Sequence, residues 1–274
     1  MNDKLQKKTA LITGGTGFIG SNLARELVSK NWQVHVLARD TSSVDALLEI
    51  QASIQIHRLT HNIQNLKNIL INVQPTCVFH VASLFLADHQ PDQVNELVQS
   101  NIAFPALLLE AMRLSGVRNL VNTGTSWQHY ENANYNPVNL YAATKQAFEA
   151  LASYYIEAHG FKICTLKLFD TYGPNDPRPK LISLLWKTAL EGKALEMSPG
   201  EQVVDFVHIQ DVVEAYCRAA ELIETQTSRY ASYGVSSGKP MKLKDLVKVF
   251  ERATKLPLPI NWGGRPYRTR EVMK

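Results

Sequence analysis

The sequence predicts an α/β fold, in which helices cover both faces of a doubly wound, mostly parallel sheet and a smaller C-terminal lobe follows. Short runs that are almost continuously apolar recur through the first part of the chain, as is typical of strands buried on both faces. Segments with helical periodicity lie between these runs. After Leu168 the alternation gives way to the Pro- and Gly-rich stretch FDTYGPNDPRPKLI, which indicates the change to the lobe.

Six apolar runs are expected to form the strands of the sheet. They read TALIT, VHVL, SIQIH, TCVFHVAS, NLVNTG and KICTLKL, at residues 9–13, 34–37, 53–57, 76–83, 119–124 and 162–168. Helices between parallel strands require right-handed crossovers.

Three helices are expected over residues 19–31, 95–116 and 140–160. The second and third end at Gly116 and Gly160, the residue type that is common at helix C-termini. Pro105 should kink the second helix, because proline cannot donate a backbone hydrogen bond. Residues 203–223 predict a strand and then a helix that return to the main domain. The predicted division is therefore a main domain of residues 1–170 with 203–224, and a lobe of residues 171–202 and 225–274.

Composition describes an ordinary globular protein. The chain has 274 residues, of which 45% are hydrophobic and 20% charged, and its formal net charge of +4 is spread along the sequence. Neither a nucleic-acid partner nor a membrane span is expected, and the polar N-terminus leads directly into a strand without a signal peptide. We therefore expect a cytoplasmic location. Cys77, Cys164 and Cys217 are far apart and are expected to be buried free thiols, with no metal site.

A glycine-rich loop follows the first predicted strand. In LITGGTGFIGSNLA, Gly14, Gly17 and Gly20 stand between that strand and the first helix. Glycines there allow a tight turn and a close approach to a pyrophosphate, and the helix N-terminus supplies N–H groups and a positive dipole. The sequence therefore predicts a dinucleotide site in the main domain, formed first by Gly14, Thr16, Gly17, Phe18, Ile19 and Gly20.

Arg39 stands at the end of the second predicted strand, where NAD-binding chains carry an acid that bonds the ribose 2′-hydroxyl. A guanidinium followed by Thr41, Ser42 and Ser43 would suit a 2′-phosphate instead. This pattern favours NADP (as NADPH) over NAD. The alternative is that Arg39 is a solvated side chain at the start of a loop.

Several motifs together resemble those of the extended short-chain dehydrogenase/reductase family, the NAD(P)-dependent epimerases, dehydratases and reductases of sugar nucleotides. They are TGGTGFIG at 13–20, FHVAS at 79–83, YAATK at 141–145, YGP at 172–174 and DFVHIQDVVEA at 205–215, and they cover nearly the whole chain. The resemblance implies a Rossmann-type main domain, a smaller C-terminal α/β lobe that binds the substrate, and a homodimer.

Tyr141 and Lys145 are expected to be catalytic. They are four residues apart and share one helix face, so the ammonium can lie near the phenol and lower its pKa. The resemblance implies that Tyr141 exchanges a proton with the substrate oxygen and that Lys145 also bonds the nicotinamide ribose. It also implies that Thr125 hydrogen-bonds the reacting oxygen, with Thr123 and Ser126 as the alternatives.

The resemblance implies roles for further residues. Asn101 should support the active site, and His80 is expected to be a packed, hydrogen-bonded histidine. Cofactor contacts are expected from Asn62 and Ile63, which come after His61, and from Val81, Ala82, Ser83, Asn101 and Phe169. Substrate contacts are expected from Leu84, Thr125, Asp170, Arg178, Lys180 and Arg268, with Arg265 as a further cation. Relatives usually continue past RPYRTREVMK into another helix, so we expect the lobe to be incomplete.

The two residues after Thr125 restrict the type of reaction that is expected. Dehydratases of sugar nucleotides carry an Asp-Glu pair there, whereas this chain has Ser126 and Trp127, so dehydration is not expected. Arg39 favours a reductase, and the chain resembles the CDP-abequose and CDP-paratose synthases of O-antigen (lipopolysaccharide) deoxyhexose biosynthesis. The expected reaction is NADPH-dependent reduction of the 4-keto group of a CDP- or dTDP-linked deoxyhexose. An NAD-dependent sugar-nucleotide 4-epimerase and a catalytically silent NADP-binding sensor or scaffold stay open as alternatives.

Overall fold

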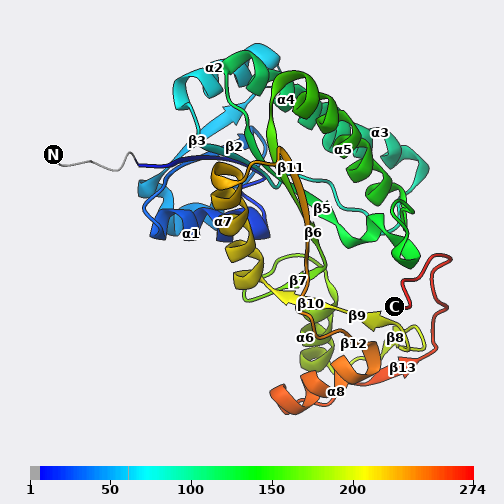
Figure 1. The fold of residues 1–274 in the computed structure, drawn as a ribbon. Coiled ribbons are helices and arrows are strands. Elements are labelled where there is room, and N and C mark those ends of the chain that lie inside the picture. The colour runs from blue at the N-terminus through cyan, green and yellow to red at the C-terminus, as the bar shows by residue number, and fades with distance from the viewer. Residues whose placement is uncertain (1–6, 61) are drawn as a thin grey trace.

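Seven parallel strands form the central sheet of the computed structural model, which describes residues 7–60 and 62–274 (Figure 1). Their order across the sheet is β11-β6-β5-β4-β1-β2-β3. The strands are β1 (Thr9–Thr13), β2 (Gln33–Arg39), β3 (Ile54–Leu59), β4 (Cys77–His80), β5 (Asn119–Thr125), β6 (Lys162–Leu168) and β11 (Tyr230–Val235). The chain reverses its direction of winding between β1 and β4, which confirms the predicted doubly wound, Rossmann-type fold.

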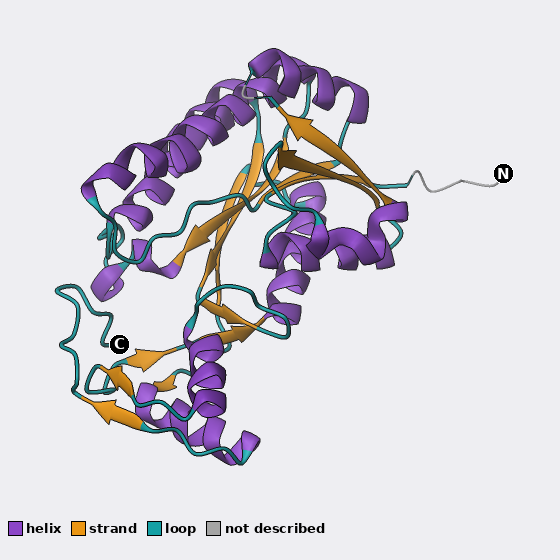
Figure 2. Cartoon of the chain, turned by 180° about the vertical axis from the view of Figure 1, so that it is seen from behind, coloured by secondary structure: helices purple, strands orange, loops and turns teal. Residues whose placement is uncertain are grey.

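Helices cover both faces of this sheet (Figure 2). On one face lie α1 (Phe18–Ser29) and α7 (Ile209–Thr225), and on the other lie α2 (Ile63–Val73), α4 (Phe104–Ser115) and α5 (Leu140–His159). Strand β1 contributes to both cores, because Ala10 and Ile12 pack toward α1 and α7 whereas Leu11 packs toward the opposite layer. Helix α7, which belongs to residues 203–224, packs against α1.

The predicted helix over residues 95–116 is interrupted. It consists of α3 (Val94–Val98), a π-helical segment (Gln99–Ala103) and α4, with Pro105 in the first turn of α4. The irregular segment lies just before the proline, which cannot donate a backbone hydrogen bond to the preceding turn. The sequence analysis missed α2 and a 3₁₀ segment over Asp45–Ser53, and it extended β4 beyond its end at His80. Other 3₁₀ turns are Pro91–Gln93, Ser126–Gln128 and Tyr130–Asn132.

The C-terminal lobe consists of short elements below the sheet in Figure 1. Its own small core contains Leu185, Val247 and Phe250. The helices are α6 (Leu181–Glu191) and α8 (Leu243–Thr254), and two-stranded sheets join β7 (Asp170–Tyr172) to β10 (Phe206–His208), β9 (Val203–Val204) to β12 (Met241–Lys242), and β8 (Leu195–Met197) to β13 (Ile260–Trp262).

Two strands lie elsewhere than predicted. The strand within residues 203–223 was expected to rejoin the main domain, but β10 pairs with β7. Conversely, residues 225–274 were all assigned to the lobe, but β11 pairs in parallel with β6 and extends the central sheet. A local sequence pattern predicts that a strand forms but not which strand it pairs with. The remaining boundaries between the two parts stay a prediction.

Cys77, Cys164 and Cys217 are free and buried, as predicted. Within residues 7–60 and 62–274, no helix is both long and apolar enough to cross a membrane. The same residues contain no group of three or more His, Cys, Asp or Glu side chains that could hold a metal ion.

Candidate active site

A cavity of about 840 Å³ opens at the carboxyl ends of the central strands and continues to the lobe. Ligands of doubly wound sheets bind at this position, outside the point where the strand order reverses. Most of the predicted site residues line the cavity: Gly14, Thr16, Gly17, Phe18, Ile19, Gly20, Arg39, Val81, Ala82, Ser83, Leu84, Thr125, Tyr141, Phe169, Asp170, Arg178 and Lys180.

The glycine-rich loop has the close contacts that a dinucleotide loop requires. Gly14 has a φ of +70°, and a Cβ there would lie 2.6 Å from the backbone nitrogen of Ala82. A Cβ on Gly20 would lie 2.2 Å from the carbonyl oxygen of Gly14. Gly17 is the N-cap of α1, and no side chain of the described residues caps this helix end. The residues therefore fit a pyrophosphate, which would accept hydrogen bonds from the first N–H groups of α1.

Arg39 is exposed and lines the other end of the cavity together with the half-buried Ser42. Arg58 on β3 donates from Nη1 to the carbonyl oxygens of Arg39, at 2.8 Å, and of Ser42, at 3.0 Å. Arg58 therefore fixes the loop that carries Arg39. The sequence analysis missed Arg58, although its place at the end of the next strand is a signal that could have found it.

Asn62 caps α2, because its Oδ1 accepts the N–H of Gln64 at 2.8 Å. The described residues that line the cavity at this end are instead Leu59 and Leu66, and they include neither Asn62 nor Ile63. Their contact with a cofactor stays a prediction, and His61 lies outside the described residues.

Thr125 and Tyr141 line the same cavity from two elements, the end of β5 and the first turn of α5. The Thr125 hydroxyl accepts the N–H of Trp127 at 3.3 Å, so its own proton can be donated to a substrate oxygen. Thr123 is committed elsewhere, since its hydroxyl donates to the carbonyl of His80 at 2.7 Å. Ser126 also lines the cavity.

Burial dominates the protonation of the Tyr-Lys pair. It raises the pKa of Tyr141 to about 12, although Ser83 and Arg178 act in the opposite direction. Burial lowers the pKa of Lys145 to about 8, against the effect of Glu149. The net shift of the Tyr141 pKa is therefore upward, because the phenol is desolvated. The effect of Lys145 on this pKa stays a prediction. Lys145 is only 3% exposed and lies outside the cavity lining of the described residues.

Asn101 connects the segment after β4 to α5. Its Oδ1 accepts the backbone N–H of Leu84 at 2.8 Å and the hydroxyl of Ser83 at 3.1 Å. Its Nδ2 donates to the carbonyl of Leu84 at 2.9 Å and to Oγ1 of Thr144 at 3.0 Å. Asn101 is buried behind the cavity and holds two of its walls together.

His80 is a packed histidine, as predicted. The Thr13 hydroxyl oxygen accepts the N–H of Ala82 at 3.2 Å, and the same hydroxyl bonds Nδ1 of His80 at 2.8 Å. Burial lowers the pKa of His80 to about 3, so the ring is neutral at neutral pH.

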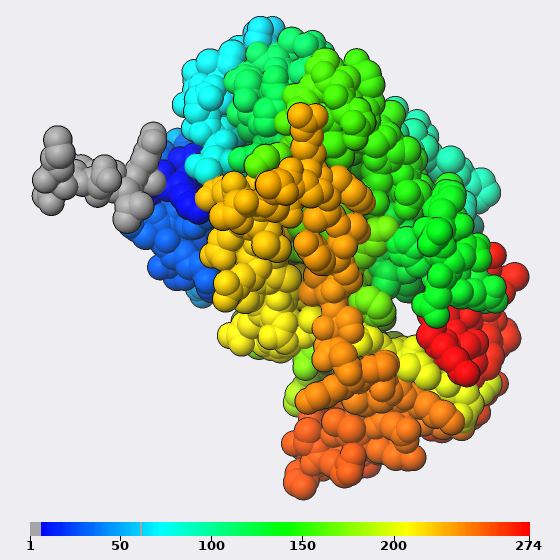
Figure 3. All heavy atoms as spheres, viewed as in Figure 1, coloured from blue at the N-terminus to red at the C-terminus, as the bar shows by residue number. Residues whose placement is uncertain are grey.

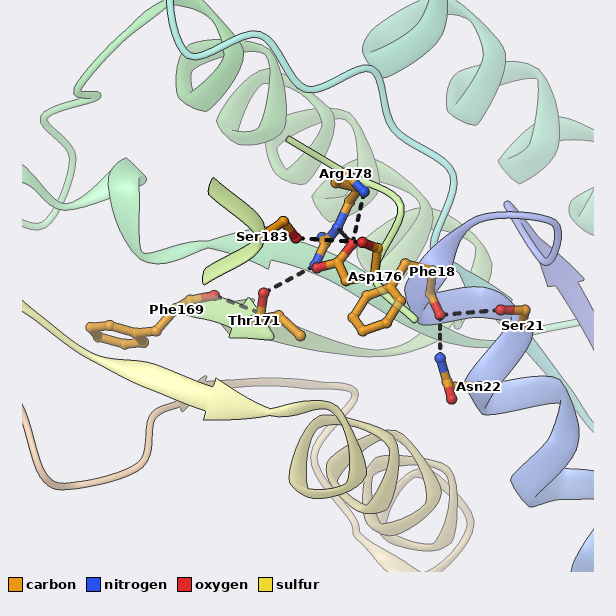
Figure 4. A network of polar contacts seen from close by, with 8 residues as sticks. All are labelled: Phe18, Ser21, Asn22, Phe169, Thr171, Asp176, Arg178 and Ser183. Carbon is orange, nitrogen blue, oxygen red and sulfur yellow. Dashed lines mark hydrogen bonds and ion pairs between the residues drawn. The ribbon is translucent and has the colours of Figure 1, made fainter. Parts of the chain in front are cut away.

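Arg178 joins the lobe to the start of α1 (Figure 4). Its Nε and Nη2 each donate to a carboxylate oxygen of Asp176 at 2.7 Å, and Nη2 also donates to the carbonyl of Thr171 at 3.0 Å. The guanidinium lies 4.6 Å from the centre of the Phe18 ring. Because Asp176 already neutralises Arg178, this side chain is a weaker candidate for gripping a diphosphate than the sequence suggested.

Lys180 and Asp170 form the charged part of the substrate end. The Lys180 ammonium lies 3.7 Å from the centre of the Phe85 ring. Burial raises the pKa of Asp170, and the charge of Lys180 counteracts this rise. Burial lowers the pKa of Lys180. Either group can contact a polar substrate without leaving the cavity wall.

Three aromatic rings form a wall next to the reacting position. Phe85 lies 5.0 Å from Tyr141 in an edge-on arrangement and 5.7 Å from Trp127, as measured between ring centres. All three residues line the cavity. The sequence analysis did not predict this wall, because Phe85 and Trp127 belong to irregular segments without periodicity.

The C-terminal residues connect the lobe to the loop after β5, and Figure 3 shows them in red between these two parts. The Arg268 guanidinium lies 6.0 Å from the Trp127 ring, outside the described cavity lining. Arg270 bonds Oδ1 of Asn136, and the carbonyl of Met273 accepts the N–H of Val203 at 3.1 Å. Arg265 remains within the lobe, where its backbone N–H donates to Met197.

The chain is similar to known proteins over almost its whole length. The chain is 26% identical over 272 residues to the CDP-abequose synthase of Salmonella muenchen, a match that covers 97% of this chain and 88% of the relative. The solved structure of MoeE5 in complex with UDP-glucose and NAD is 26% identical, with a TM-score of 0.83 and coverage of 97% and 87%. UDP-glucose 4-epimerase from Brucella ovis, in complex with NAD, has the same fold, with a TM-score of 0.85, 21% identity and coverage of 97% and 88%.

A family model matches residues 10–231, which contain the glycine-rich loop, Thr125, Tyr141 and Lys145. This match confirms the resemblance that the motifs indicated. The chain belongs to the NAD dependent epimerase/dehydratase family.

Proposed function

We propose that this protein reduces the 4-keto group of a nucleotide-activated deoxyhexose, CDP- or dTDP-linked, with NADPH as the reductant. The observation that carries the proposal is the position of Arg39 at the end of β2, in the same cavity as Thr125 and Tyr141. A guanidinium there suits a 2′-phosphate and thus a cofactor that is consumed rather than retained.

The protonation state of Tyr141 supports reduction. With a pKa of about 12, the phenol holds its proton at neutral pH and can act as the acid. NADPH, when bound, supplies a hydride to the carbonyl carbon. Tyr141 then gives its proton to the carbonyl oxygen, while the Thr125 hydroxyl donates a hydrogen bond to the same oxygen. Lys145 lies one helical turn from Tyr141 and favours the phenolate that forms.

The aromatic wall supports a deoxy sugar. Phe85 and Trp127 offer apolar surface beside Tyr141, where the sugar ring must lie for proton transfer. A fully hydroxylated hexose would place hydroxyl groups against these rings without hydrogen-bond partners, which costs free energy. The relatives named CDP-abequose synthase also support this assignment.

The decisive experiment is a screen of CDP-, dTDP-, GDP- and UDP-linked 4-keto sugars for oxidation of NADPH, followed by absorbance. We expect consumption with a CDP- or dTDP-linked 4-keto-deoxyhexose and no consumption by the Tyr141→Phe variant. The control without sugar nucleotide corrects for slow background oxidation.

A second candidate is a sugar-nucleotide 4-epimerase that retains NAD, which the solved MoeE5 complexes containing NAD favour. It predicts NAD that copurifies with the protein and interconversion of 4-epimers without net NADPH oxidation. Binding of NADPH without turnover of any substrate would instead support the sensor or scaffold alternative.

We also propose a homodimer through α4 and α5. These helices pack side by side (Figure 1). Leu114 on α4 and Leu151 and Tyr154 on α5 are exposed. Exposed apolar side chains on adjacent helices are typical of contact surfaces between copies of a chain.

A further inference from the structure

A series of buried polar side chains begins at the backbone of Thr125 and ends on β6. Gln128, which is fully buried, accepts the Thr125 N–H through Oε1 at 2.9 Å and donates through Nε2 to Glu149 Oε1 at 2.7 Å. Glu149 is paired with Lys167 at 3.6 Å, and their side chains are only 8% and 13% exposed. The end of β5 is thereby connected to α5 and β6.

Lys167 and Glu149, at the β6 end of the series, have further hydrogen-bond partners. Lys167 donates to Nε2 of His129, whose Nδ1 bonds the carbonyl of Ala133 at 3.0 Å. The hydroxyl of Tyr230 donates to Oε2 of Glu149 at 3.3 Å. A buried ion pair contributes little net stability compared with apolar residues of the same size. Stability alone therefore gives no reason for charges at this place.

The backbone of β5 is shaped to admit these side chains. A Cβ on Gly124, next to Thr125, would lie 2.9 Å from Oε1 of Gln128 and 3.1 Å from Cγ of Lys167. Both distances are shorter than ordinary contacts, so a larger residue at position 124 would displace the two side chains.

Glu149 also acts on Lys145, which lies one turn earlier on α5. Its negative charge raises the pKa of Lys145, in opposition to burial. One carboxylate thus influences both Thr125, through Gln128, and the charge of Lys145.

We propose that Gln128, Glu149 and Lys167 are positioning residues, which hold Thr125 and Lys145 in the mutual arrangement that proton transfer through Tyr141 needs. This inference rests on the catalytic roles in the proposed function. We name the three side chains the positioning series.

The first test is Glu149→Gln, which keeps the shape of the side chain and removes its charge. We expect kcat to fall about 10- to 100-fold, because small displacements of catalytic groups have effects of this size. KM and the Kd of NADPH should stay within about threefold, since none of the three side chains is among the residues that line the cavity. The alkaline limb of the kcat/KM profile should move to lower pH, because the charge that raises the pKa of Lys145 is absent.

A double variant separates positioning from stability. Glu149→Gln with Lys167→Met removes both charges and leaves neither one unpaired, so the thermal stability lost in the single variants should return. We expect kcat to stay low in the double variant. Recovery of kcat together with Tm would show a purely structural role and overturn the proposal.

Gln128→Met removes the bonds to the Thr125 N–H and to Glu149 but keeps both charges of the Glu149–Lys167 pair. It should lower kcat by a similar factor and leave the alkaline limb in place. The matched control is Gln202→Met in the lobe, where another buried glutamine donates to Oγ of Ser198 at 2.9 Å. The control should lower Tm and leave kcat within about twofold.

Unchanged kcat in Gln128→Met and in the double variant, beside an inactive Tyr141→Phe enzyme, would overturn the positioning series alone. A fully active Tyr141→Phe enzyme would overturn the proposed function and this inference with it. The two failures are therefore distinguishable.

Discussion

Tyr141 is buried against Phe85, and the desolvation of its phenol determines whether it starts the reaction as a proton donor or as a proton acceptor. A pKa of about 12 keeps the proton on Tyr141 throughout the neutral range. We predict that Tyr141→Phe lowers kcat by roughly 10²- to 10⁴-fold, because the acid is removed while the ring stays in place. Steady-state kinetics and NADPH titration check this, and cofactor affinity should be nearly unchanged. Full activity in the variant would assign the acid to another group.

In the proposed function Arg39 contacts the cofactor, whereas Arg58 supports the backbone that carries Arg39. We predict that Arg39→Ala weakens NADPH binding about 10- to 150-fold with little effect on NADH, since a charge-assisted pair contributes roughly 1.5–3 kcal/mol. Arg58→Met should reduce NADPH affinity only about fivefold, because it frees the loop but leaves the guanidinium of Arg39. Fluorescence titration of both cofactors measures these ratios. Equal affinities for NADPH and NADH in the unaltered protein would make Arg39 a solvated side chain.

Single residues could be predicted from sequence where a motif fixes their spacing. Tyr141, Thr125 and the glycines were found because their separation along the chain is set by one helix, one strand end and one loop. Arg58 was not, because it acts through the pairing of β2 with β3. The pKa of Tyr141 also depends on the fold, since burial is a property of all the elements around the ring.

At the scale of elements, β2 and β3 carry a pair of histidines whose protonation is expected to make the folding stability depend on pH. Nδ1 of His35 lies 2.9 Å from Nε2 of His57. Burial, and to a smaller extent His57, lowers the pKa of His35 from 6.5 to about 4, and burial also lowers the pKa of His57. Below pH 6.5 the unfolded chain therefore binds more protons than the folded one, and stability falls as pH decreases toward 4.

The expected loss from His35 is up to about 3 kcal/mol across this window, at about 1.4 kcal/mol per pH unit. We predict that a His35→Leu variant loses less stability than the unaltered protein between pH 7 and pH 5. Urea unfolding measures the free energy of unfolding of both proteins at pH 7 and at pH 5. The value for each protein at pH 8 serves as its reference. An equal loss in both proteins would contradict a contribution from His35.

Elements were predictable where burial imposes a continuous apolar pattern. Strands β1, β2, β4, β5 and β6 obey this rule because both of their faces are covered, whereas the edge strand β3 is only partly buried. The pattern does not record the partner of a strand, so the strand β10 was assigned to the main domain although it pairs with β7. Strand β11 was not predicted, and its residues were assigned to the lobe. The π-helical segment before Pro105 also has no periodicity of its own, although it carries Asn101.

At the scale of the whole molecule, α4 and α5 leave apolar side chains of the main domain uncovered. Helices α4 and α5 expose Leu114, Leu151 and Tyr154, the last with 60% of its surface accessible. A dimer that packs these helices against their copies would bury this surface, and it would leave the cavity, which opens at the strand ends, accessible. No local motif indicates the surface, because it exists only after the two helices are placed side by side.

We predict that Leu151→Glu, together with Tyr154→Glu, converts the protein from a dimer to a monomer, because two carboxylates per subunit would be desolvated in the interface. Light scattering coupled to gel filtration measures the mass, and NADPH binding shows that the variant is folded. The matched control is Leu190→Glu on α6, where the apolar side chain is 76% exposed but lies on the lobe. The control should leave the mass unchanged. A single-chain mass for the unaltered protein, or a shift produced equally by the control, would exclude α4 and α5 as the contact.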